Sequence, residues 1–597
     1  MCGILAMHGL ERPFHHGLVR SLRNRGPDAV GFWIDRDVSL AHTRLSIIGL
    51  DDRGTQPLEN ERHVLTFNGE IYNFLELQEK LSGAGINQTA CTDSQVLLHA
   101  WTQWGPDILT QLSGFWAFVI YDKRSHTLTL VRDQLGIKPL YYWHDAEKTC
   151  VSSMIGTILD TVGESPDLNY EAMSEYVRYQ FTFGDKTFVR QIRKVLPGHL
   201  VEINLVTGQL VDRCYDNILS PENHSIVGFS PELVRQTEEL IVQCCQDSTI
   251  SDTSFTTFCS GGMDSSLITG ITKPEVAYHC NYSDPDCNET FFAREVVGHT
   301  DTRLMVVNAQ ESFDIIQRVQ NLVQDFDELT IGSVIFPLDD LLTQVKRRYK
   351  VILTGTGGDE LFGGYVRYQL ALGQCFQDSY RALHERMQRI EGVPGRFEMT
   401  HRKGNPAMYA FYTPTVEQTF RDHFDACRNG GGDLYTMLTF DRRYFLSGLL
   451  NIDDKMCGRH SLESRPSFLH QKLVRHVLTI SPDVLLSNNE LKFLLRRASS
   501  RYLPESVLRR QDKMGFTTPI GTFINKSAHL IREQIVNSRF RHLYNLKSAN
   551  FTAETKFSRE VFGLLMLDLW LDRYACPRST KVTTKLDYAS SFSHAMV

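Results

Sequence analysis

The stretch Ser260-Gly261-Gly262-Met263-Asp264-Ser265-Ser266 follows a short apolar segment, Phe255–Phe258, and precedes apolar residues at helical spacing. Its two glycines allow backbone N–H groups to approach a phosphate closely, and its hydroxyl groups can donate further hydrogen bonds. The N-terminus of the following helix adds a positive dipole. The pattern differs from the G-x-x-x-x-G-K-[ST] loop of other nucleotide-binding proteins. In a strand–loop–helix setting it predicts a phosphate-binding loop.

Helices and short apolar strands alternate around this loop. Ser230-Pro231-Glu232 predicts the start of a helix, because Ser can cap it, Pro suits its first turn and Glu favours its positive end. A helix near Leu338–Arg348 leads into the apolar strand Val351–Leu353. This alternation predicts a parallel sheet. In the last third of the chain helical patterns dominate, ending with Ser558–Ala575.

A second glycine-rich turn follows the strand that ends at Leu353. It reads Gly355-Thr356-Gly357-Gly358-Asp359-Glu360-Leu361-Phe362-Gly363-Gly364-Tyr365. Glycines permit close approach to a nucleotide, and the carboxylates suit Mg²⁺, which prefers oxygen ligands. Because the turn comes after an apolar strand, we expect it to face the same ligand as the first loop.

The first third of the chain reads mostly as short strands and turns. Apolar or alternating segments at His63–Phe67, Phe115–Tyr121 and Thr127–Val131 predict strands, and the last two are joined by a polar turn. His199–Asn204 predicts a final strand of this region. The polar stretch 215–228 then predicts a linker.

The second residue of the chain is a cysteine, Cys2. Its small side chain makes removal of Met1 chemically reasonable, and removal exposes a residue with both a thiol and an α-amine. An α-amine has a pKa of about 7.7–8.0, so it can serve as general base to its own thiol, directly or through a water. A cysteine at this position is weak evidence by itself.

The residues that follow Cys2 in sequence suit free glutamine. Arg44 can pair in a bidentate manner with the α-carboxylate, and Asp93 can hold the α-ammonium. Asn68 and the Gly69 N–H can form an oxyanion hole for the amide carbon under attack. Glu70, next in the chain, belongs to the same predicted glutamine-binding group. We therefore predict that Cys2, Asn68 and Gly69 are catalytic.

Composition limits the remaining classes of protein. The chain has 597 residues, 42% hydrophobic and 22% charged, which is typical of a globular protein of two to four domains. Its net charge of -7 offers no broad basic field for nucleic acid. Its 13 cysteines include no C-x-x-C pair, which argues against a zinc site or a secreted disulfide framework. The sequence contains no signal-peptide pattern and no long apolar run, so we expect a cytoplasmic protein without a membrane partner.

Several segments of the N-terminal third together resemble the class II glutamine amidotransferase domain of the glutamine-hydrolysing asparagine synthetase family. These segments are MCGI, RGPD from Arg25, AHTRLSI, FNGEIYNF, TDS, LSGFWAF and RDQLGIKPLYY. The resemblance covers about residues 2–205 and implies an αββα sandwich of the N-terminal-nucleophile (Ntn) hydrolase type. A phosphoribosyl amidotransferase would share this half, but residues 260–266 argue against one.

The C-terminal half resembles the synthetase domain of the same family. Residues 260–266 resemble the loop of ATP pyrophosphatases, residues 355–365 resemble a second signature, and Lys492 resembles the lysine that contacts pyrophosphate. Arg510 and Lys513, before Gly515-Phe516, resemble a further basic element near the site. The ATP-binding residues that we expect are Ser260, Gly261, Gly262, Asp264, Ser265, Ser266, Gly355, Thr356, Gly357, Asp359 and Lys492, with Asp264 and Asp359 as candidate Mg²⁺ ligands.

The resemblance implies a two-domain α/β protein with a tunnel for ammonia. We expect a glutaminase domain over 1–210, an ATP-pyrophosphatase domain with a parallel sheet and added helices over 225–576, and a polar tail over 577–597. The implied reaction is L-aspartate + ATP + glutamine → asparagine + AMP + pyrophosphate + glutamate. ATP and Mg²⁺ are the expected cofactors. Partners are then small molecules, and homodimers are common in the family.

Departures from the family pattern concern the acceptor rather than glutamine. Thr356 replaces a Glu that the family associates with the acyl-adenylate step, and the run from Arg465 to His470 replaces Arg-Val-Pro-Phe-Leu-Asp. Thr330–Ser333 lacks an Arg that often binds substrate, while Asn24 replaces a His with little expected effect. Alternatives therefore stay open: another carboxylate such as a uronic acid sugar or a natural-product acid, a glutaminase with a degenerate synthetase half, or a non-catalytic relative.

Overall fold

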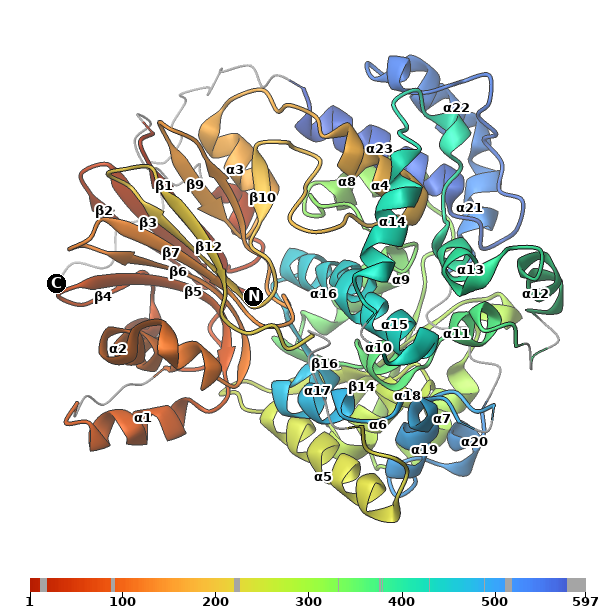
Figure 1. The fold of residues 1–597 in the computed structure, drawn as a ribbon, viewed down its shortest axis with the longest axis horizontal. Helices are drawn as coiled ribbons and strands as arrows, with labels where there is room; N and C mark the ends of the chain where they lie inside the picture. The colour runs from red at the N-terminus through yellow and green to blue at the C-terminus, as the bar shows by residue number, and fades with distance from the viewer. Residues whose placement is uncertain are drawn as a thin grey trace.

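The computed structural model describes residues 1–10, 19–86, 92–219, 226–330, 332–374, 377, 380–428, 430–487, 489–510 and 518–576. A β-sandwich forms one side of the molecule and a larger, mainly helical part forms the other (Figure 1). The N-terminus lies between the two (Figure 1). The predicted tail 577–597 lies outside the described residues.

Two six-stranded sheets make up the sandwich, in the orders β10-β8-β9-β1-β3-β2 and β12-β11-β7-β6-β5-β4. The strands of the first sheet are β1 (Gly3–His8), β2 (Ala29–Asp35), β3 (Val38–Arg44), β8 (Tyr141–His144), β9 (Thr149–Ser152) and β10 (Ile192–Lys194). Those of the second are β4 (Leu58–Glu59), β5 (His63–Ile71), β6 (Gly114–Asp122), β7 (Thr127–Arg132), β11 (His199–Asn204) and β12 (Leu210–Cys214). Apolar side chains such as Ile4, Val119 and Leu130 are buried together in the sandwich. The αββα fold predicted for this half is confirmed.

The described residues of this half include four α-helices, although its sequence suggested mostly strands and turns. They are α1 (Phe74–Gly83), α2 (Asp93–Trp104), α3 (Ile155–Val162) and α4 (Tyr170–Tyr179). The Thr92 hydroxyl caps α2 by accepting from the N–H of Gln95, and Asn169 caps α4 in the same way. These helices are only 8–12 residues long, so each offers few turns of periodic pattern to a sequence analysis.

A five-stranded parallel sheet in the order β15-β14-β13-β16-β17 forms the centre of the C-terminal half. Its strands are β13 (Phe255–Phe258), β14 (Val276–Asn281), β15 (Arg303–Asn308), β16 (Val351–Thr354) and β17 (Glu463–Pro466). The chain leaves the central strand β13 toward β14 on one side, whereas β16 pairs on the other. In open parallel sheets, ligands bind where the strand order reverses in this way, at the carboxyl ends of the strands. The parallel sheet predicted from the sequence is confirmed.

Helices surround this sheet and extend beyond it. Those before and within the sheet region are α5 (Pro231–Asp247), α6 (Met263–Thr272), α7 (Thr290–Gly298), α8 (Ile315–Val323), α9 (Ile335–Val345) and α10 (Gly358–Phe362). The next group is α11 (Val366–Ala371), α12 (Arg381–Met387), α13 (Gly392–His401), α14 (Thr415–Asp425), α15 (Gly432–Phe440) and α16 (Leu446–Arg459). The last are α17 (Gln471–Leu478), α18 (Pro482–Leu485), α19 (Phe493–Ala498), α20 (Glu505–Leu508), α21 (Ile520–Lys526), α22 (Ala528–Asn537) and α23 (Glu560–Tyr574).

A widened helical turn separates α15 from α16. Asp441–Phe445 forms a π-helix that is continuous with both helices. The guanidinium of Arg442 in this turn donates to the backbone carbonyls of Glu360 and Leu361 in α10, at 3.1 and 2.8 Å. The π-helical turn is thereby attached to the short helix within the second glycine-rich stretch.

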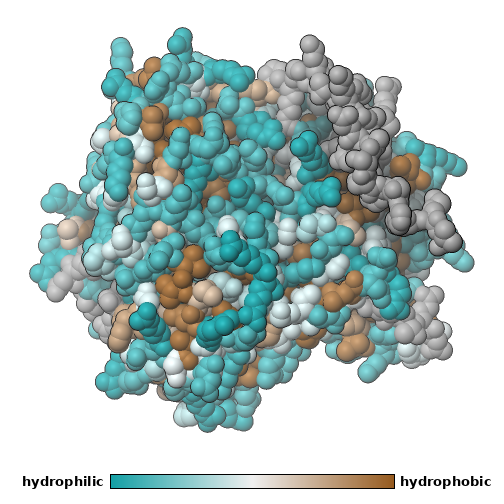
Figure 2. All heavy atoms as spheres, turned by 180° about the vertical axis from the view of Figure 1, so that it is seen from behind, coloured by the Kyte–Doolittle hydropathy of each residue, from teal (hydrophilic) through white to brown (hydrophobic). Residues whose placement is uncertain are grey.

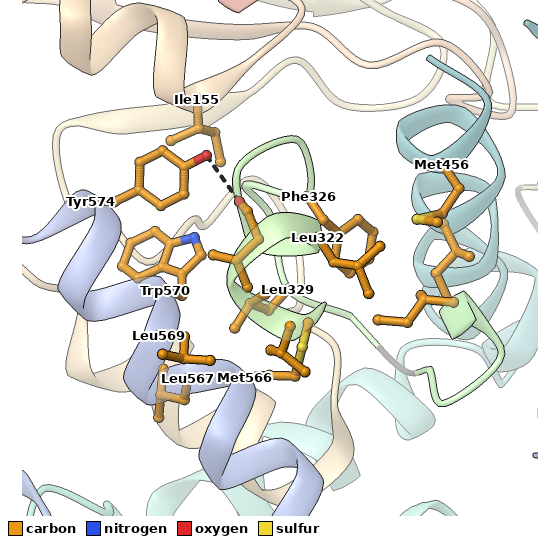
Figure 3. Close-up of a cluster of buried hydrophobic side chains, with 14 of the residues drawn as sticks. Ile155, Leu322, Phe326, Leu329, Met456, Met566, Leu567, Leu569, Trp570 and Tyr574 are labelled. Carbon is orange, nitrogen blue, oxygen red and sulfur yellow. Dashed lines mark hydrogen bonds between the residues drawn. The ribbon is translucent and has the colours of Figure 1, made fainter. Parts of the chain in front are cut away.

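One hydrophobic cluster joins the two halves (Figure 3). Ile155 of α3 lies near Trp570 and Tyr574 of α23, and the Tyr574 hydroxyl donates to the carbonyls of Val323 and Gln324 (Figure 3). The Trp570 indole N–H donates to the Asp327 carbonyl at 2.7 Å. Because the cluster contains buried side chains from both halves, it holds them in a fixed relation.

The face of the molecule that Figure 2 shows is mainly hydrophilic, with apolar patches between hydrophilic residues. None of the helices in the described ranges has the length and apolar character needed to cross a membrane. The cysteines that the structure describes are all free thiols.

Candidate functional site

Cys2 lies at the start of β1, at the boundary between the two halves. Its backbone N–H donates to Asn68 Oδ1 at 2.9 Å, and its Sγ accepts from the Leu45 N–H at 3.5 Å. Met1 is buried, and its ammonium donates to the carbonyl of Leu462 at 3.0 Å. Removal of Met1 would turn the Cys2 nitrogen into the α-amine. That amine would then stand beside the thiol and already face Asn68.

Asn68 and Gly69 stand next to Cys2 on β5. The Asn68 Oδ1 accepts from Cys2, whereas its buried Nδ2 has no hydrogen-bond partner among the described residues. A buried amide N–H₂ without a partner is unfavourable unless a ligand satisfies it. Gly69 has φ of +150°, and a Cβ there would lie 2.0 Å from the Phe115 carbonyl oxygen. The strand pairing therefore requires glycine at this position.

The residues predicted to bind glutamine lie in the same region, and their side chains have different environments. Asp93 accepts from the N–H groups of Ile71 and Ser94 at 3.0 and 2.7 Å, and burial raises its pKa to about 6. Burial also raises the pKa of the Glu70 carboxyl well above its usual range, with Glu463 and Asp93 adding to the effect. The Arg465 guanidinium, 3.2 Å from Glu70 Oε1, partly opposes it. The carboxylates of Glu70 and Asp93 thus form a buried acidic pair.

Arg44 is buried on β3, and its guanidinium holds a loop. It donates to the carbonyls of Asp51 at 2.6 Å and Ile48 at 3.3 Å, and to that of Gly49. Arg44 therefore shapes the segment 48–51 beside the site. Its pairing with the carboxylate of glutamine stays a prediction.

The first glycine-rich loop joins β13 to α6, as predicted. Ser265 Oγ accepts from the Ser260 N–H at 3.0 Å and lies 2.9 Å from Ser260 Oγ. Ser260 Oγ accepts in turn from the Gly262 N–H at 3.2 Å. These contacts fold the backbone into a tight turn, and Gly262 caps the N-terminus of α6. N–H groups at a helix N-terminus can bind phosphate oxygens.

Lys492 lies opposite this loop, just before α19. Its Nζ is 2.6 Å from both carboxylate oxygens of Asp264 and also pairs with Asp359. Lys492 is 5% exposed and 228 residues from Asp264 in the chain. The structure thus brings together the loop, the second glycine-rich turn and the lysine that only the resemblance had indicated.

The second glycine-rich turn packs against the first loop without intervening side chains. A Cβ at Gly355 would lie 2.8 Å from both the Asp264 Cβ and the Ser265 nitrogen. Glycine at 355 therefore lets the ends of β13 and β16 approach each other. The two predicted loops form one site at the point where the strand order reverses.

Two cavities meet at this site and share Asp359 and Tyr365 in their walls. One, of about 310 Å³, has a basic lining that comprises Arg367, Lys403, Lys492, Arg496 and Arg510. The other, of about 260 Å³, reaches from Ser260 and Gly355–Gly357 to Asp453 and apolar side chains of α9 and α16. A basic cavity suits the phosphates of a nucleotide, and the second suits a less charged group.

The basic residue Arg510, predicted to lie near the site, reaches the first loop. Its guanidinium donates to the Gly261 carbonyl at 3.3 Å and pairs with Glu289 at 2.5 Å. Lys513 and Gly515-Phe516, from the same predicted element, lie outside the described residues, as does Ile331 within Thr330–Ser333. Thr330 donates its hydroxyl to the Gly448 carbonyl at 3.1 Å.

A buried ion pair connects Cys2 of one half to the helix α16 of the other. Arg25 Nε donates to the Cys2 carbonyl at 2.9 Å, while its Nη1 and Nη2 lie 2.6 and 3.1 Å from the two carboxylate oxygens of Asp454. The side chains of this pair are only 3% and 2% exposed. The sequence analysis used Arg25 only as part of the RGPD segment of the family resemblance, and its role across the interface was missed.

Asp453, the preceding residue of α16, faces the nucleotide side. Its Oδ2 accepts from the Thr356 hydroxyl, from the Thr354 hydroxyl at 3.2 Å and from the Ser464 hydroxyl at 3.5 Å. Burial raises its pKa to about 6. The position that lacks the family's Glu, Thr356, is therefore in contact with another carboxylate. Asp453 and Asp454 face different elements because consecutive helical residues point about 100° apart.

The other departures from the family pattern lie at the interface between the halves. His470 stacks on Tyr72 with ring centroids 5.0 Å apart, and its Nε2 lies 3.0 Å from Ser248 Oγ. Burial lowers the pKa of His470 to about 3, so it is neutral. Arg465, which matches the first position of the family pattern, pairs with Glu463 at 2.8 Å. The Asn24 amide donates to Asp325 at 3.1 Å. These contacts give the substituted residues structural partners.

Comparisons with known proteins agree with this two-part arrangement. A family model described as a glutamine amidotransferase domain matches residues 1–215, and one described as asparagine synthase matches residues 236–572. Asparagine synthetase [glutamine-hydrolyzing] 1 of Bacillus subtilis is 27% identical over 586 residues, which cover 92% of this chain and 91% of that protein. Asparagine synthetase B of Escherichia coli is 26% identical, covering 91% of this chain and 86% of that protein.

A solved structure of glutamine phosphoribosylpyrophosphate amidotransferase from B. subtilis, in complex with ADP and GMP, is also similar. It is 15% identical, covers 62% of this chain and 77% of that chain, and has a TM-score of 0.28. This similarity is too low to support an argument about function.

The fold and the site define an amide-forming ligase that combines a glutamine amidotransferase domain with a synthetase domain. The asparagine synthase model spans more than half of the chain, and the chain belongs to the asparagine synthase family.

Proposed function

We propose that this enzyme makes L-asparagine from L-aspartate, with glutamine as nitrogen donor and ATP cleaved to AMP and pyrophosphate. One observation carries the proposal: the carbonyl of Cys2 is tied through Arg25 to Asp454, and the next residue, Asp453, lines the cavity beside the glycine-rich loops. A site suited to release ammonia and a site suited to activate a carboxylate thus meet at two consecutive residues. The names of the relatives in Bacillus subtilis and Escherichia coli support the choice of product.

In the glutamine site, the Cys2 thiol attacks the side-chain amide, and the α-amine of Cys2 takes the thiol proton. The unpartnered Asn68 Nδ2 and the Gly69 N–H stabilise the developing oxyanion. The carboxylates of Asp93 and Glu70 bind the α-ammonium of glutamine, and Arg44 binds its α-carboxylate. The contact between Asn68 Oδ1 and the Cys2 N–H supports these roles.

In the nucleotide site, the hydroxyls and N–H groups of the loop 260–266 bind phosphate oxygens, and Lys492 contacts the departing pyrophosphate. The carboxylates of Asp264 and Asp359 converge on the same Lys492 Nζ, so their oxygens can also share one cation. Mg²⁺ commonly binds one or two carboxylates together with substrate phosphates, and these two aspartates fit that pattern. When bound there, Mg²⁺ would neutralise phosphate charge during adenylation.

Adenylation is needed because a carboxylate at neutral pH is a poor electrophile, whereas AMP is a good leaving group. Ammonia released at Cys2 would be protonated and diluted in bulk water. Cys2 is partly buried, and the Arg25–Asp454 pair beside it is buried between the halves. This arrangement suits transfer inside the protein, through the tunnel that the resemblance implies. A homodimer and a cytoplasmic location stay predictions.

A second candidate is amidation of a different carboxylate, such as a uronic acid sugar or a natural-product acid. The observation that favours it is the lining of the cavity at Asp453, which includes no arginine or lysine among the described residues. Free aspartate carries a second carboxylate that would normally be paired with a cation. An acceptor without that group would fit this wall.

The test is a product assay by mass spectrometry with the Met1-processed enzyme, ATP, Mg²⁺, glutamine and aspartate. Asparagine, AMP and pyrophosphate in equal amounts are expected. Cys2→Ala should abolish glutamine use and retain synthesis from added ammonia, whereas Asp264→Asn should lose ATP use and retain glutaminase activity.

Three outcomes separate the candidates. Glutamate without asparagine from the wild type would exclude aspartate, and the same assay with uronic acids would then test the second candidate. Absence of ATP–pyrophosphate exchange with every acid would indicate a glutaminase with an inactive synthetase half. Equal loss of both activities in each variant would contradict the division between Cys2 and Asp264.

A further inference from the structure

The Asp453 carboxylate has a position that binding of ATP does not explain. It projects from α16 into the cavity whose walls include Ser260, Gly355 and Thr356. It immediately precedes Asp454, which is tied through Arg25 to the Cys2 carbonyl. Asp453 is therefore one residue from the contact with Cys2 and also lines the cavity that the proposed function assigns to the activated acid.

The hydrogen bonds of Asp453 leave one oxygen available. The hydroxyls of Thr356, Thr354 and Ser464 all donate to Oδ2. Of the residues that the structure describes, none donates to Oδ1. No arginine or lysine lies within salt-bridge distance of Asp453 in the described part of the chain, whereas Asp454 next to it is fully paired. Asp453 is thus oriented by hydroxyls and can still accept a proton.

The basicity of this group suits proton transfer. Burial raises the pKa of Asp453 to about 6, and Asp454 acts in the same direction. A carboxylate with that pKa is ionised near neutral pH and is a stronger base than an ordinary aspartate.

We propose that Asp453 is the general base of amide formation, a role that rests on the proposed function. The ammonia lone pair forms the C–N bond with the carbonyl carbon of the acyl-adenylate. The C–O bond to AMP breaks, and AMP leaves with its electron pair. The proton lost from nitrogen goes to Asp453 Oδ1. Thr356, which stands where the family pattern has Glu, is then a positioning residue that holds the carboxylate supplied by α16.

The experiment compares two half-reactions in wild type, Asp453→Asn and the control Asp483→Asn, an exposed acid on α18. Aspartate-dependent ATP–pyrophosphate exchange reports adenylation, and asparagine formed from ammonium chloride reports amide formation. In Asp453→Asn, exchange should stay within about threefold of wild type while amide formation falls by about 10²-fold or more. Asp483→Asn should match wild type in both.

Hydroxylamine in place of ammonia distinguishes a base from a merely structural residue. After it attacks, its nitrogen is acidic enough to lose a proton to water without help from the protein. Hydroxamate formation by Asp453→Asn should therefore fall by less than about tenfold. Adding Thr356→Glu to Asp453→Asn returns a carboxylate to the cavity from the turn after β16 and should restore at least about tenfold of the lost ammonia-dependent rate.

The outcomes are decisive in each direction. Loss of exchange in Asp453→Asn, equal loss with ammonia and hydroxylamine, or ammonia-dependent synthesis near the wild-type rate would each overturn the role of Asp453. Wild-type enzyme that shows neither exchange nor amide formation with aspartate would instead overturn the proposed function, and the inference with it.

Discussion

The ion pair between Arg25 and Asp454 allows a quantitative test of how the two halves depend on each other. Asp454→Asn removes the negative charge and leaves the Arg25 guanidinium, 3% exposed, without a counter-ion. Breaking a buried pair in this way costs about 3–5 kcal/mol. At about 2–4 °C per kcal/mol for domains of this size, the melting transition should fall by about 6–20 °C.

A double variant separates loss of charge pairing from loss of packing. Arg25→Met with Asp454→Leu replaces both charges by apolar groups, which is often nearly neutral for stability. We expect it to recover most of the melting temperature. It also lacks the hydrogen bond from Arg25 Nε to the Cys2 carbonyl. A hydrogen bond to a charged group contributes about 1.5–3 kcal/mol, so glutaminase kcat/KM should fall by about 10- to 150-fold.

Differential scanning calorimetry and a glutamate assay measure the two effects. The control is Glu232→Gln, which removes an Arg–carboxylate pair whose side chains are 63% and 53% exposed. Such exposed pairs contribute about 0–1 kcal/mol, so its transition should stay near that of wild type. The reasoning fails if Asp454→Asn melts within about 2 °C of wild type, or if the double variant is no more stable than Asp454→Asn.

Two further predictions concern the glutamine site. Gly69→Ala places a Cβ 2.0 Å from the Phe115 carbonyl oxygen. It should therefore lower glutaminase activity at least 10²-fold, while ammonia-dependent synthesis continues. Normal glutaminase kinetics in this variant would contradict the strand geometry. Asp93 has a pKa of about 6, above the usual 3.8, so it becomes neutral as the pH falls through 6. The KM for glutamine should rise by up to about tenfold per pH unit below 6. In Asp93→Asn, KM should be high and independent of pH, and a pH-dependent KM in that variant would point to another group.

Local sequence patterns predicted the elements that are determined by a single continuous segment of the chain. The strand–loop–helix at 255–272, the strand at 199–204 and the capped start of α5 follow from neighbouring residues, and the structure shows them at those positions. The four short helices around the sandwich were missed because their patterns span few turns. Lys492 was found only through the family resemblance, since no local pattern distinguishes it from a lysine on a solvated helix.

Contacts between distant segments could not be predicted. Arg25 and Asp454 are 429 residues apart, and Thr356 and Asp453 are 97 apart. From the sequence, Thr356 indicated that the synthetase site lacks a carboxylate. It kept open the alternative of a degenerate synthetase half. The structure shows a carboxylate in contact with its hydroxyl, because α16 brings one from another part of the chain. The net charge of a site depends on every element that contributes a side chain to it. A substitution at one motif position therefore does not reveal that net charge.

The π-helical turn Asp441–Phe445 has a consequence for insertions and deletions in this chain. A π turn holds one more residue than an α turn, so α16 leaves it rotated by about 100° from the direction that an uninterrupted helix would take. Deletion of one residue from this turn would let α15 and α16 merge into one regular helix. Asp453 and Asp454 would then both be turned away from their partners, although neither had been replaced. The direction in which the side chains of α16 point around the helix axis is thus set by a single additional residue. That residue lies in a turn that itself contacts neither Cys2 nor the loop 260–266.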